Sequence, residues 1–159
     1  MNKKVIIGGV VGIVAILCIG GYYSVIMKSA DTKQNTNTKT PVVQNGTDIS
    51  IPVADLGATA TFYSYDSSGV TIRYFAVKDT QGNVHVAFDA CDVCYEAKKG
   101  YKQVGDVMQC LNCGKQFAIT KIGTENTNGG CWPSYLPMSL NGSIVIIKVS
   151  DLVEKQFMF

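Results

Sequence analysis

The strongest signal in the sequence lies in residues 91–117, which read CDVCYEAKKGYKQVGDVMQCLNCGKQF. The stretch holds two pairs of cysteines with two residues inside each pair, Cys91 with Cys94 and Cys110 with Cys113. Its glycines and its lack of a sustained apolar period indicate loops. Loops this long in a compact domain are usually functional or held by something other than a core. Two cysteines on a tight turn can point both sulfurs at one ion, so the spacing predicts a four-thiolate metal ribbon.

The predicted ligands are Cys91, Cys94, Cys110 and Cys113. A tetrahedral site of four sulfurs suits zinc, a single iron or an iron–sulfur cluster. Outside the cell, two disulfides are the alternative. The region after residue 50 holds five cysteines, and an odd number fits four ligands plus one further thiol better than a full disulfide set. The fifth, Cys131, is a candidate fifth ligand or a lid thiol over the site, and its alternative is a small buried residue.

Outward from these loops, the sequence predicts a mainly β fold. Residues 59–65, 70–77 and 83–88 are rich in β-branched and aromatic side chains with a period of two. The turn sequences DSSG (66–69) and DTQG (79–82) separate them, which predicts an antiparallel meander. Further strands are expected at 107–109, 116–119 and 143–149, and Ser150 and Asp151 are expected to cap a short helical turn. No long amphipathic helix is visible, so residues 51–159 are expected to form a small antiparallel β domain.

The N-terminal region has a different character. Residues 5–27 read VIIGGVVGIVAILCIGGYYSVIM and carry no charge. About 20 apolar residues cross the hydrocarbon layer as a helix, so we predict a single transmembrane anchor. Basic residues within 1–4 favour a cytoplasmic N-terminus and a domain that faces outside. The alternatives are a cleaved signal peptide and a lipid-modified Cys18. Residues 28–50 are polar and are expected to be a flexible linker.

Composition argues against several functions. The formal net charge is only +2, whereas a nucleic-acid binder needs a strongly basic face, so nucleic acid is not an expected partner. The single histidine, His85, argues against a Ser-His-Asp catalytic triad and a His-rich metal site, and its flanking valines indicate a strand face. No nucleophile–base pair is apparent. We therefore assign no catalytic residue and expect a non-enzymatic electron carrier or metal-binding protein rather than an enzyme.

Three segments carry a resemblance to a known family: AFDACDVCYEAKKGY (87–101), GDVMQCLNCGKQFAITKIGTEN (105–126) and GGCWP (129–133). They resemble the membrane iron–sulfur containing protein family of the FtrD type, and the similarity covers 51–159. It implies an iron–sulfur cofactor and an association with ferrous-iron uptake at the membrane. It also maps the family's cysteines onto Cys91, Cys94, Cys110, Cys113 and Cys131. Family members are often fused to several membrane spans, whereas this chain has one predicted span.

The two ligand loops are also distantly similar to the Rieske arrangement. In that arrangement each loop supplies one Cys and one His, whereas both positions in each loop are Cys here. Because His ligation raises the reduction potential of Rieske centres, the all-sulfur set implies a lower one. The domain is therefore expected to be Rieske-like or ribbon-like.

Together, these observations predict a membrane-anchored iron–sulfur or iron-binding protein at the outer side of the cell membrane. Its expected role is electron transfer linked to iron uptake or membrane redox chemistry, with a redox protein or an iron permease as partner. One alternative is a structural zinc ribbon that supports an interaction domain. Another is a metal-delivery protein in which Cys131 helps to pass the metal to a permease.

Overall fold

The computed structural model describes residues 38–39, 42–44 and 46–159. All of these belong to one compact unit, Asn37–Phe159. The predicted N-terminus (1–4), the predicted anchor (5–27) and most of the predicted linker (28–50) lie outside the described residues. Within the part of the chain that the structure describes, no helix is long and apolar enough to cross a membrane.

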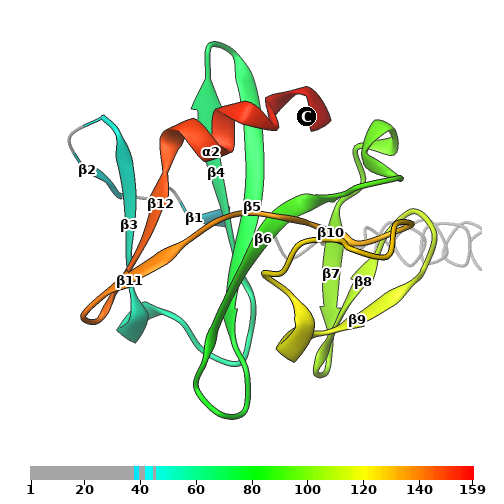
Figure 1. Cartoon of the computed structure of the whole chain (residues 1–159), viewed down its shortest axis with the longest axis horizontal. Coiled ribbons are helices and arrows are strands. Elements are labelled where there is room, and N and C mark those ends of the chain that lie inside the picture. The colour runs from blue at the N-terminus through cyan, green and yellow to red at the C-terminus, as the bar shows by residue number, and fades with distance from the viewer. Residues whose placement is uncertain (1–37, 40–41, 45) are drawn as a thin grey trace, which may run out of the picture. The chain divides into compact units, whose positions relative to one another are not determined.

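The described chain forms three small sheets (Figure 1). The first has the order β1 (Thr38–Lys39), β4 (Thr61–Ser67), β5 (Val70–Lys78), β6 (Val84–Cys91) and β10 (Pro133–Tyr135). The second has the order β11 (Ser139–Asn141), β12 (Ile144–Lys148), β3 (Asp48–Pro52) and β2 (Val42–Gln44). The third consists of β7 (Tyr101–Val104), β8 (Val107–Cys110) and β9 (Gln116–Ala118). Apart from the parallel pair β1–β4, the described strands pair antiparallel, which confirms the mainly β prediction.

The predicted meander is the centre of the fold. Strand β5 pairs with β4 on one side and with β6 on the other, both antiparallel. Aspartates close both connecting turns as the turn sequences predicted, because a short carboxylate can accept bonds from nearby amides. The Asp66 side chain accepts a bond from the amide of Gly69 at 3.2 Å, and Asp79 accepts one from the amide of Asn83 at 2.9 Å.

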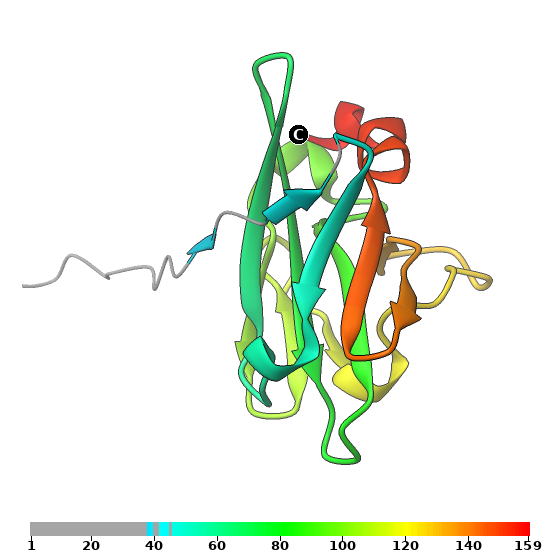
Figure 2. The same cartoon turned by 90° about the vertical axis from the view of Figure 1, so that its left-hand side faces the viewer.

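The meander is buried on both faces. Because successive side chains along a strand point to opposite sides, neighbouring residues of β5 pack into two different hydrophobic clusters. On one face, Tyr74 packs in a hydrophobic cluster with Ile49 of β3 and Ile147 of β12. On the other face, Phe75 packs in a second cluster with Met108 of β8. In Figure 1, β3 lies to the left of the meander and β7 to β9 lie to its right. In Figure 2, β2, β3 and β12 face the viewer.

Several strands were not expected from the sequence. Strands β1 and β2 and the start of β3, which buries Ile49 completely, all lie in the segment expected as linker, so that part of the linker prediction is wrong. Strands β7, β10 and β11 have only three or four residues each. Segments that short cannot display a clear alternation of apolar and polar residues, so their pairing with neighbouring strands decides them.

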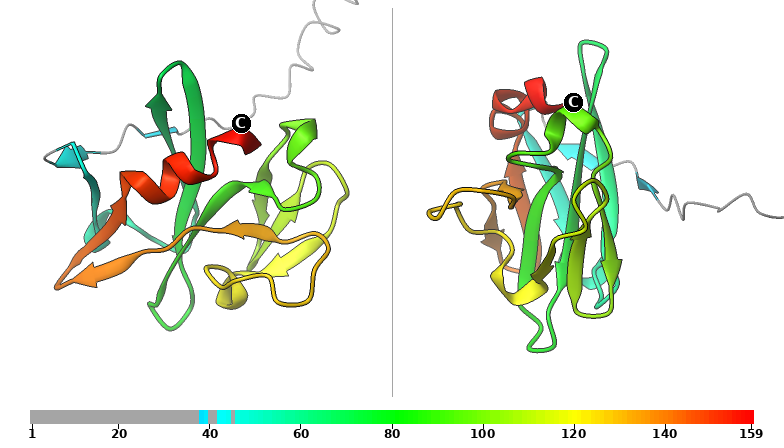
Figure 3. Two further views of the ribbon diagram at one scale, coloured as in Figure 1. Left: turned by 45° about the horizontal axis from the view of Figure 1, so that its top comes forward. Right: turned by 90° about the vertical axis from the view of Figure 1, so that its right-hand side faces the viewer.

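The predicted helical turn near the end of the domain exists, but its predicted cap is wrong. Helix α2 (Val149–Glu154) buries Leu152 completely, and Figure 3 shows it following β12. Its N-cap residue is Lys148, and no side chain caps the helix. The Ser150 hydroxyl bonds to Asp151 at 3.3 Å instead. The other helical turns of the described residues are short 3-10 segments: η1 (Val53–Asp55), η2 (Tyr95–Ala97), η3 (Ile119–Lys121) and η4 (Gln156–Met158).

The double-sided packing of the meander predicts an unequal effect of two phenylalanine truncations. Phe75 is 0% exposed, so Phe75→Ala should lower the free energy of unfolding by about 3–5 kcal/mol through lost burial and a cavity. Phe157 is 65% exposed, so Phe157→Ala should change it by less than about 0.5 kcal/mol. Urea unfolding followed by circular dichroism measures both. Similar losses in the two variants would contradict the assigned packing.

Candidate metal centre

The five cysteines of the described chain converge as free thiols. Cys91, Cys94 and Cys131 form one group in which the sulfur atoms all lie within 4.8 Å of one another. Cys94, Cys110 and Cys113 form a second group with the same property. Because Cys94 belongs to both groups, the five sulfurs make a single cluster, which we call the five-cysteine cluster. It contains the four sulfurs predicted to be ligands, and none of its members is paired in a disulfide.

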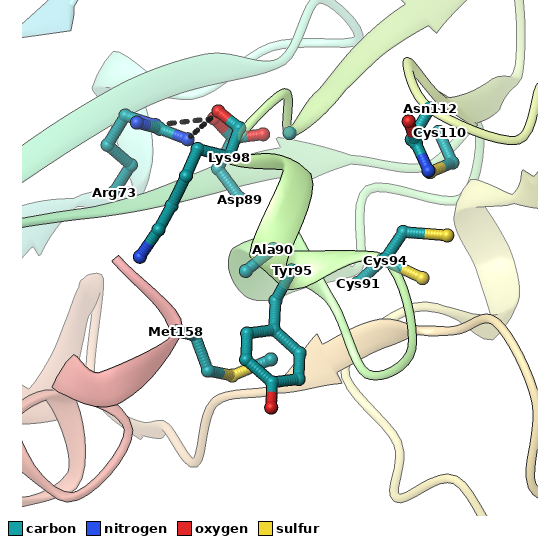
Figure 4. Close-up of a pocket in the computed structure, with 11 residues that line it drawn as sticks. Arg73, Asp89, Ala90, Cys91, Cys94, Tyr95, Lys98, Cys110, Asn112 and Met158 are labelled. Carbon is teal, nitrogen blue, oxygen red and sulfur yellow. Dashed lines mark hydrogen bonds and ion pairs between the residues drawn. The ribbon is translucent and has the colours of Figure 1, made fainter.

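The first ligand loop follows the end of β6. Cys91 is the last residue of β6, and its partner across the sheet is Pro133 of β10. The chain then turns through Cys94 into η2, where the amide of Ala97 donates to the carbonyl of Cys94 at 3.1 Å. In Figure 4 the sulfurs of Cys91 and Cys94 point toward the side where Cys110 lies. The loop therefore presents both of its sulfurs to the second pair.

The second ligand loop connects β8 to β9. The amide of Cys110 donates to the carbonyl of Lys115, and the amide of Gly114 donates to the carbonyl of Cys110, both at 2.9 Å. Gly114 has a φ of +75°, a conformation that costs a glycine little. The glycine directly after Cys113 thus lets the chain reverse tightly enough to keep both sulfurs of this pair on one side.

Cys131 reaches the cluster through β10. The amide of Asp92 donates to the carbonyl of Trp132 at 3.0 Å, which ties the residue after Cys131 to the first ligand loop. The sulfur of Cys131 lies 3.5 Å from the sulfur of Cys94 and 3.5 Å from that of Cys113. The fifth thiol therefore lies between the two predicted pairs, a position that its spacing along the chain does not indicate.

Amide donors surround the sulfur of Cys91. Burial raises the pKa of this thiol, but the amides of Val93, Cys94 and Trp132 and the nearby Tyr101 hydroxyl outweigh burial and bring the pKa to about 7. Amide hydrogens directed at a sulfur stabilise its thiolate form. Since the thiolate is the form that binds metals, the first ligand loop is prepared for a cation.

The pKa values of three further thiols are shifted in different directions. The amide of Lys115 lowers the pKa of the exposed Cys113. Burial raises the pKa of Cys110 to about 11, and it raises the pKa of Cys131, which is raised further by its contacts with neighbouring cysteines. Buried thiolates held this close repel each other, so the cluster favours full ionisation only when a cation is present.

The sulfur spacing fits one tetrahedral ion such as iron or zinc, and the all-cysteine donor set also suits an iron–sulfur cluster. In a tetrahedral site with bonds of about 2.3 Å, neighbouring sulfurs lie about 3.8 Å apart. The two groups of sulfurs, each within 4.8 Å, need only small shifts to reach that spacing. The amide donors satisfy the remaining lone pairs of metal-bound thiolates. A single ion with four ligands would leave one of the five thiols unbound.

A partly buried ion pair supports the first ligand loop (Figure 4). Asp89 lies on β6 and is 8% exposed. One of its oxygens accepts a bond from the Arg73 guanidinium at 3.1 Å, and the other accepts the amide of Tyr101 at 2.6 Å. Arg73 also donates to the carbonyl of Lys98 at 3.0 Å. Burial raises the pKa of Asp89 to about 6, although the Tyr101 amide and Arg73 act in the opposite direction.

Gly100 lies where the chain passes closest to Asp89. A Cβ atom on Gly100 would lie 2.4 Å from an Asp89 carboxylate oxygen, and the φ of Gly100 is +70°. Both facts require glycine, because any side chain would displace the carboxylate from the Tyr101 amide. Sequence reasoning did not identify Asp89 or Gly100 as supports of the site, since only the fold places them against each other.

A groove of about 620 Å³ opens beside Cys131. It is lined by residues between Lys115 and Trp132, and the Trp132 indole donates to the carbonyl of Thr124 at 3.0 Å. In the right-hand view of Figure 3, the yellow-to-orange loop that follows η3 projects away from the sheets. The groove exposes the Cys131 side of the cluster, whereas Cys91 and Cys110 are buried.

His85 lies on β6, as expected of a strand residue. Among the described residues, its ring forms no hydrogen bond with a cysteine. Its Nδ1 lies 2.9 Å from the carbonyl of Ile122, and its Nε2 lies 3.1 Å from an oxygen of Asp79. The histidine therefore joins the turn after β5 to the segment that follows η3, which is a structural contact.

The close approach of Gly100 to Asp89 predicts a selective effect on metal binding. Gly100→Ala should reduce metal affinity by about 10-fold to 100-fold, the range for loss of a group that supports metal ligands. Gly105→Ala is the matched control, because Gly105 also has a positive φ, +60°, but no atom lies within 4 Å of a Cβ there. Chelator competition measures both affinities. An equal loss in the two variants would assign the effect to backbone strain alone.

Comparison with known proteins gives one family. Residues 53–159, more than half of the chain, match the family described as membrane iron-sulfur containing protein FtrD-like. No curated protein and no solved structure matches the chain. The matched region contains the entire five-cysteine cluster and agrees with the resemblance seen in the sequence. The chain therefore belongs to the FtrD-like family of membrane iron–sulfur containing proteins.

Proposed function

We propose that this chain is a membrane-anchored electron-transfer protein whose five-cysteine cluster holds an iron–sulfur centre or a single iron. The observation that carries the proposal is the convergence of five free sulfurs, with backbone amides directed at them, on loops at one side of the domain. The name of the family supports iron and sulfide as the inorganic part. When bound, such a centre supplies reversible uptake of single electrons.

Unequal burial of the sulfurs supports a one-sided route for the electron. Cys91 and Cys110 are 3% and 2% exposed and form the inner side of the cluster. Cys113 is exposed, and Cys131 is half-buried beside the groove. A partner that docks over the outer sulfurs is closest to the centre. Val93, which is 59% exposed between the first pair of cysteines, would lie in that contact.

The membrane arrangement in this proposal follows the sequence. Residues 5–27 anchor the chain, the part of the predicted linker that precedes β1 allows the domain to reach a partner, and the domain faces outside the cell membrane. A redox protein or an iron permease in the same membrane is the proposed partner. The link to iron uptake comes from the resemblance to the FtrD type, and the description of the family as membrane proteins agrees with the anchor.

Anaerobic purification of the full chain tests the cofactor. We expect iron bound to the protein and visible absorption that bleaches on reduction, together with acid-labile sulfide if the centre is a cluster. Cys110→Ser should remove the iron and the absorption, because Cys110 belongs to the buried side of the cluster. Colourless protein with stoichiometric zinc and no labile sulfide would refute electron transfer and favour the structural zinc site.

A second candidate function, delivery of a metal to a permease, is favoured by the position of Cys131. Its sulfur lies 3.5 Å from two other cysteine sulfurs, so it can replace one of them as a ligand while the metal leaves. Ligand exchange of this kind requires a fifth thiol, whereas electron transfer through four fixed ligands does not.

Cys131→Ala separates the two functions. If the protein transfers electrons through Cys91, Cys94, Cys110 and Cys113, the variant should keep its metal content and its redox-active absorption. If it delivers metal, the rate of transfer to an external chelator should fall about tenfold or more while the fold persists. Stopped-flow measurement of chelator absorbance gives this rate, and unchanged transfer would argue against delivery.

A further inference from the structure

Three buried side-chain oxygens of the described chain have no hydrogen-bond partner: the hydroxyl groups of Ser50, Tyr74 and Tyr101. Tyr74 packs in the larger hydrophobic cluster, away from the cysteines. Tyr101 packs in the smaller cluster together with Cys91 and Cys110. Burying a hydroxyl without a hydrogen-bond partner costs free energy, so such groups in native proteins usually have a structural or functional explanation. Of the three, Tyr101 is the one beside the candidate metal centre.

The Tyr101 hydroxyl lies close to the five-cysteine cluster. A tyrosine phenol ordinarily titrates at about pH 10, so the hydroxyl carries its proton at neutral pH. A protonated phenol beside thiolates can act only as a hydrogen-bond donor toward them. The hydroxyl is near enough to Cys91 to help lower the pKa of that thiol, but no hydrogen bond of normal geometry joins it to a sulfur in the structure.

The position of the Tyr101 ring is fixed on three sides. The amide of Tyr101 donates to Asp89 at 2.6 Å, and Tyr101 pairs with Cys110 across β7 and β8. Its ring packs against Phe75 and Phe117, with ring centroids 6.3 Å and 6.2 Å apart. Tyr101 is 4% exposed, so its hydroxyl cannot turn outward to water. A donor held in this way has the buried cysteines of the cluster among its packing neighbours.

We propose that the Tyr101 hydroxyl donates a hydrogen bond to the sulfur of Cys91 when the centre is loaded, and that this bond raises the reduction potential of the centre. The hydrogen bond does not require the proposed redox function. Only the effect on the reduction potential rests on it. The small shifts that bring the sulfurs to ligand spacing would give the hydroxyl the partner that it lacks. Tyr101 is thus a tuning residue that acts through Cys91 and not a ligand.

The direction of the effect follows from charge. When the centre accepts one electron, negative charge on its sulfurs increases, and a hydrogen-bond donor stabilises the more negative state more strongly. The phenol keeps its proton throughout, so the step involves one electron and no proton from Tyr101. Loss of the donor should therefore make reduction less favourable.

The test compares Tyr101→Phe with Tyr74→Phe in the full chain, because each substitution removes one unpartnered buried hydroxyl and keeps the ring. In a redox titration of the anaerobically loaded protein, Tyr101→Phe should lower the equilibrium constant for one-electron reduction about tenfold, a fall of about 59 mV. Tyr74→Phe should leave the potential unchanged. Equal potentials in Tyr101→Phe and the unsubstituted protein would overturn the tuning role.

Two further measurements separate this proposal from the proposed function and from a general effect on folding. In cobalt(II)-loaded protein, the sulfur-to-cobalt charge-transfer band should shift in Tyr101→Phe and not in Tyr74→Phe, whether the natural metal is iron or zinc. Coincident bands would overturn the hydrogen bond itself. In metal-free protein, Tyr101→Phe should not lower the unfolding temperature, because the hydroxyl has no partner to lose there. A lower temperature would indicate a structural hydroxyl and would also overturn the proposal.

Discussion

Repulsion and desolvation within the five-cysteine cluster are the constraint that the ligand loops and the residues supporting them must satisfy. Thiolates held within a few ångströms in a partly buried site destabilise each other, and burial adds to that cost. The raised pKa values of Cys110 and Cys131 show this cost, whereas amide donors lower the pKa values of Cys91 and Cys113. A bound cation would relieve both effects, so the arrangement is one that gains stability from a metal.

The scaffold that holds the sulfurs does not itself depend on them. Strands β5 and β6 are buried on both faces, and the larger hydrophobic cluster joins them to β3 and β12 without any cysteine. The smaller cluster, in contrast, contains cysteines together with side chains of β8 and β9. One face of the meander therefore provides a stable base, while the other face carries ligand loops that a metal would hold in place.

Asp89 connects these two parts. It lies on β6, bonds to Arg73 of β5 and accepts the amide of Tyr101 at the start of β7, so it links the meander to the chain between the two ligand pairs. Gly100 makes that contact sterically possible. The same contact fixes the Tyr101 ring, and the proposed donor to Cys91 is therefore positioned by the scaffold and not by the ligand loops. Structural support and electronic tuning of the centre share one network.

The short-range pattern of the sequence was sufficient to predict the two cysteine pairs and the meander. Two residues between cysteines place both sulfurs on one turn, and a period of two along 70–77 predicts a strand whatever its neighbours are. The sequence named Cys131 as a candidate ligand or lid thiol, but its position, like that of Tyr101, was decided by tertiary structure. Both positions depend on the pairing of β10 with β6 and of β7 with β8, and β10 and β7 are too short to carry a periodic signal. Contacts between residues distant in sequence arise from packing, so spacing along the chain could identify the pairs of sulfurs but not the groups that complete and tune their site.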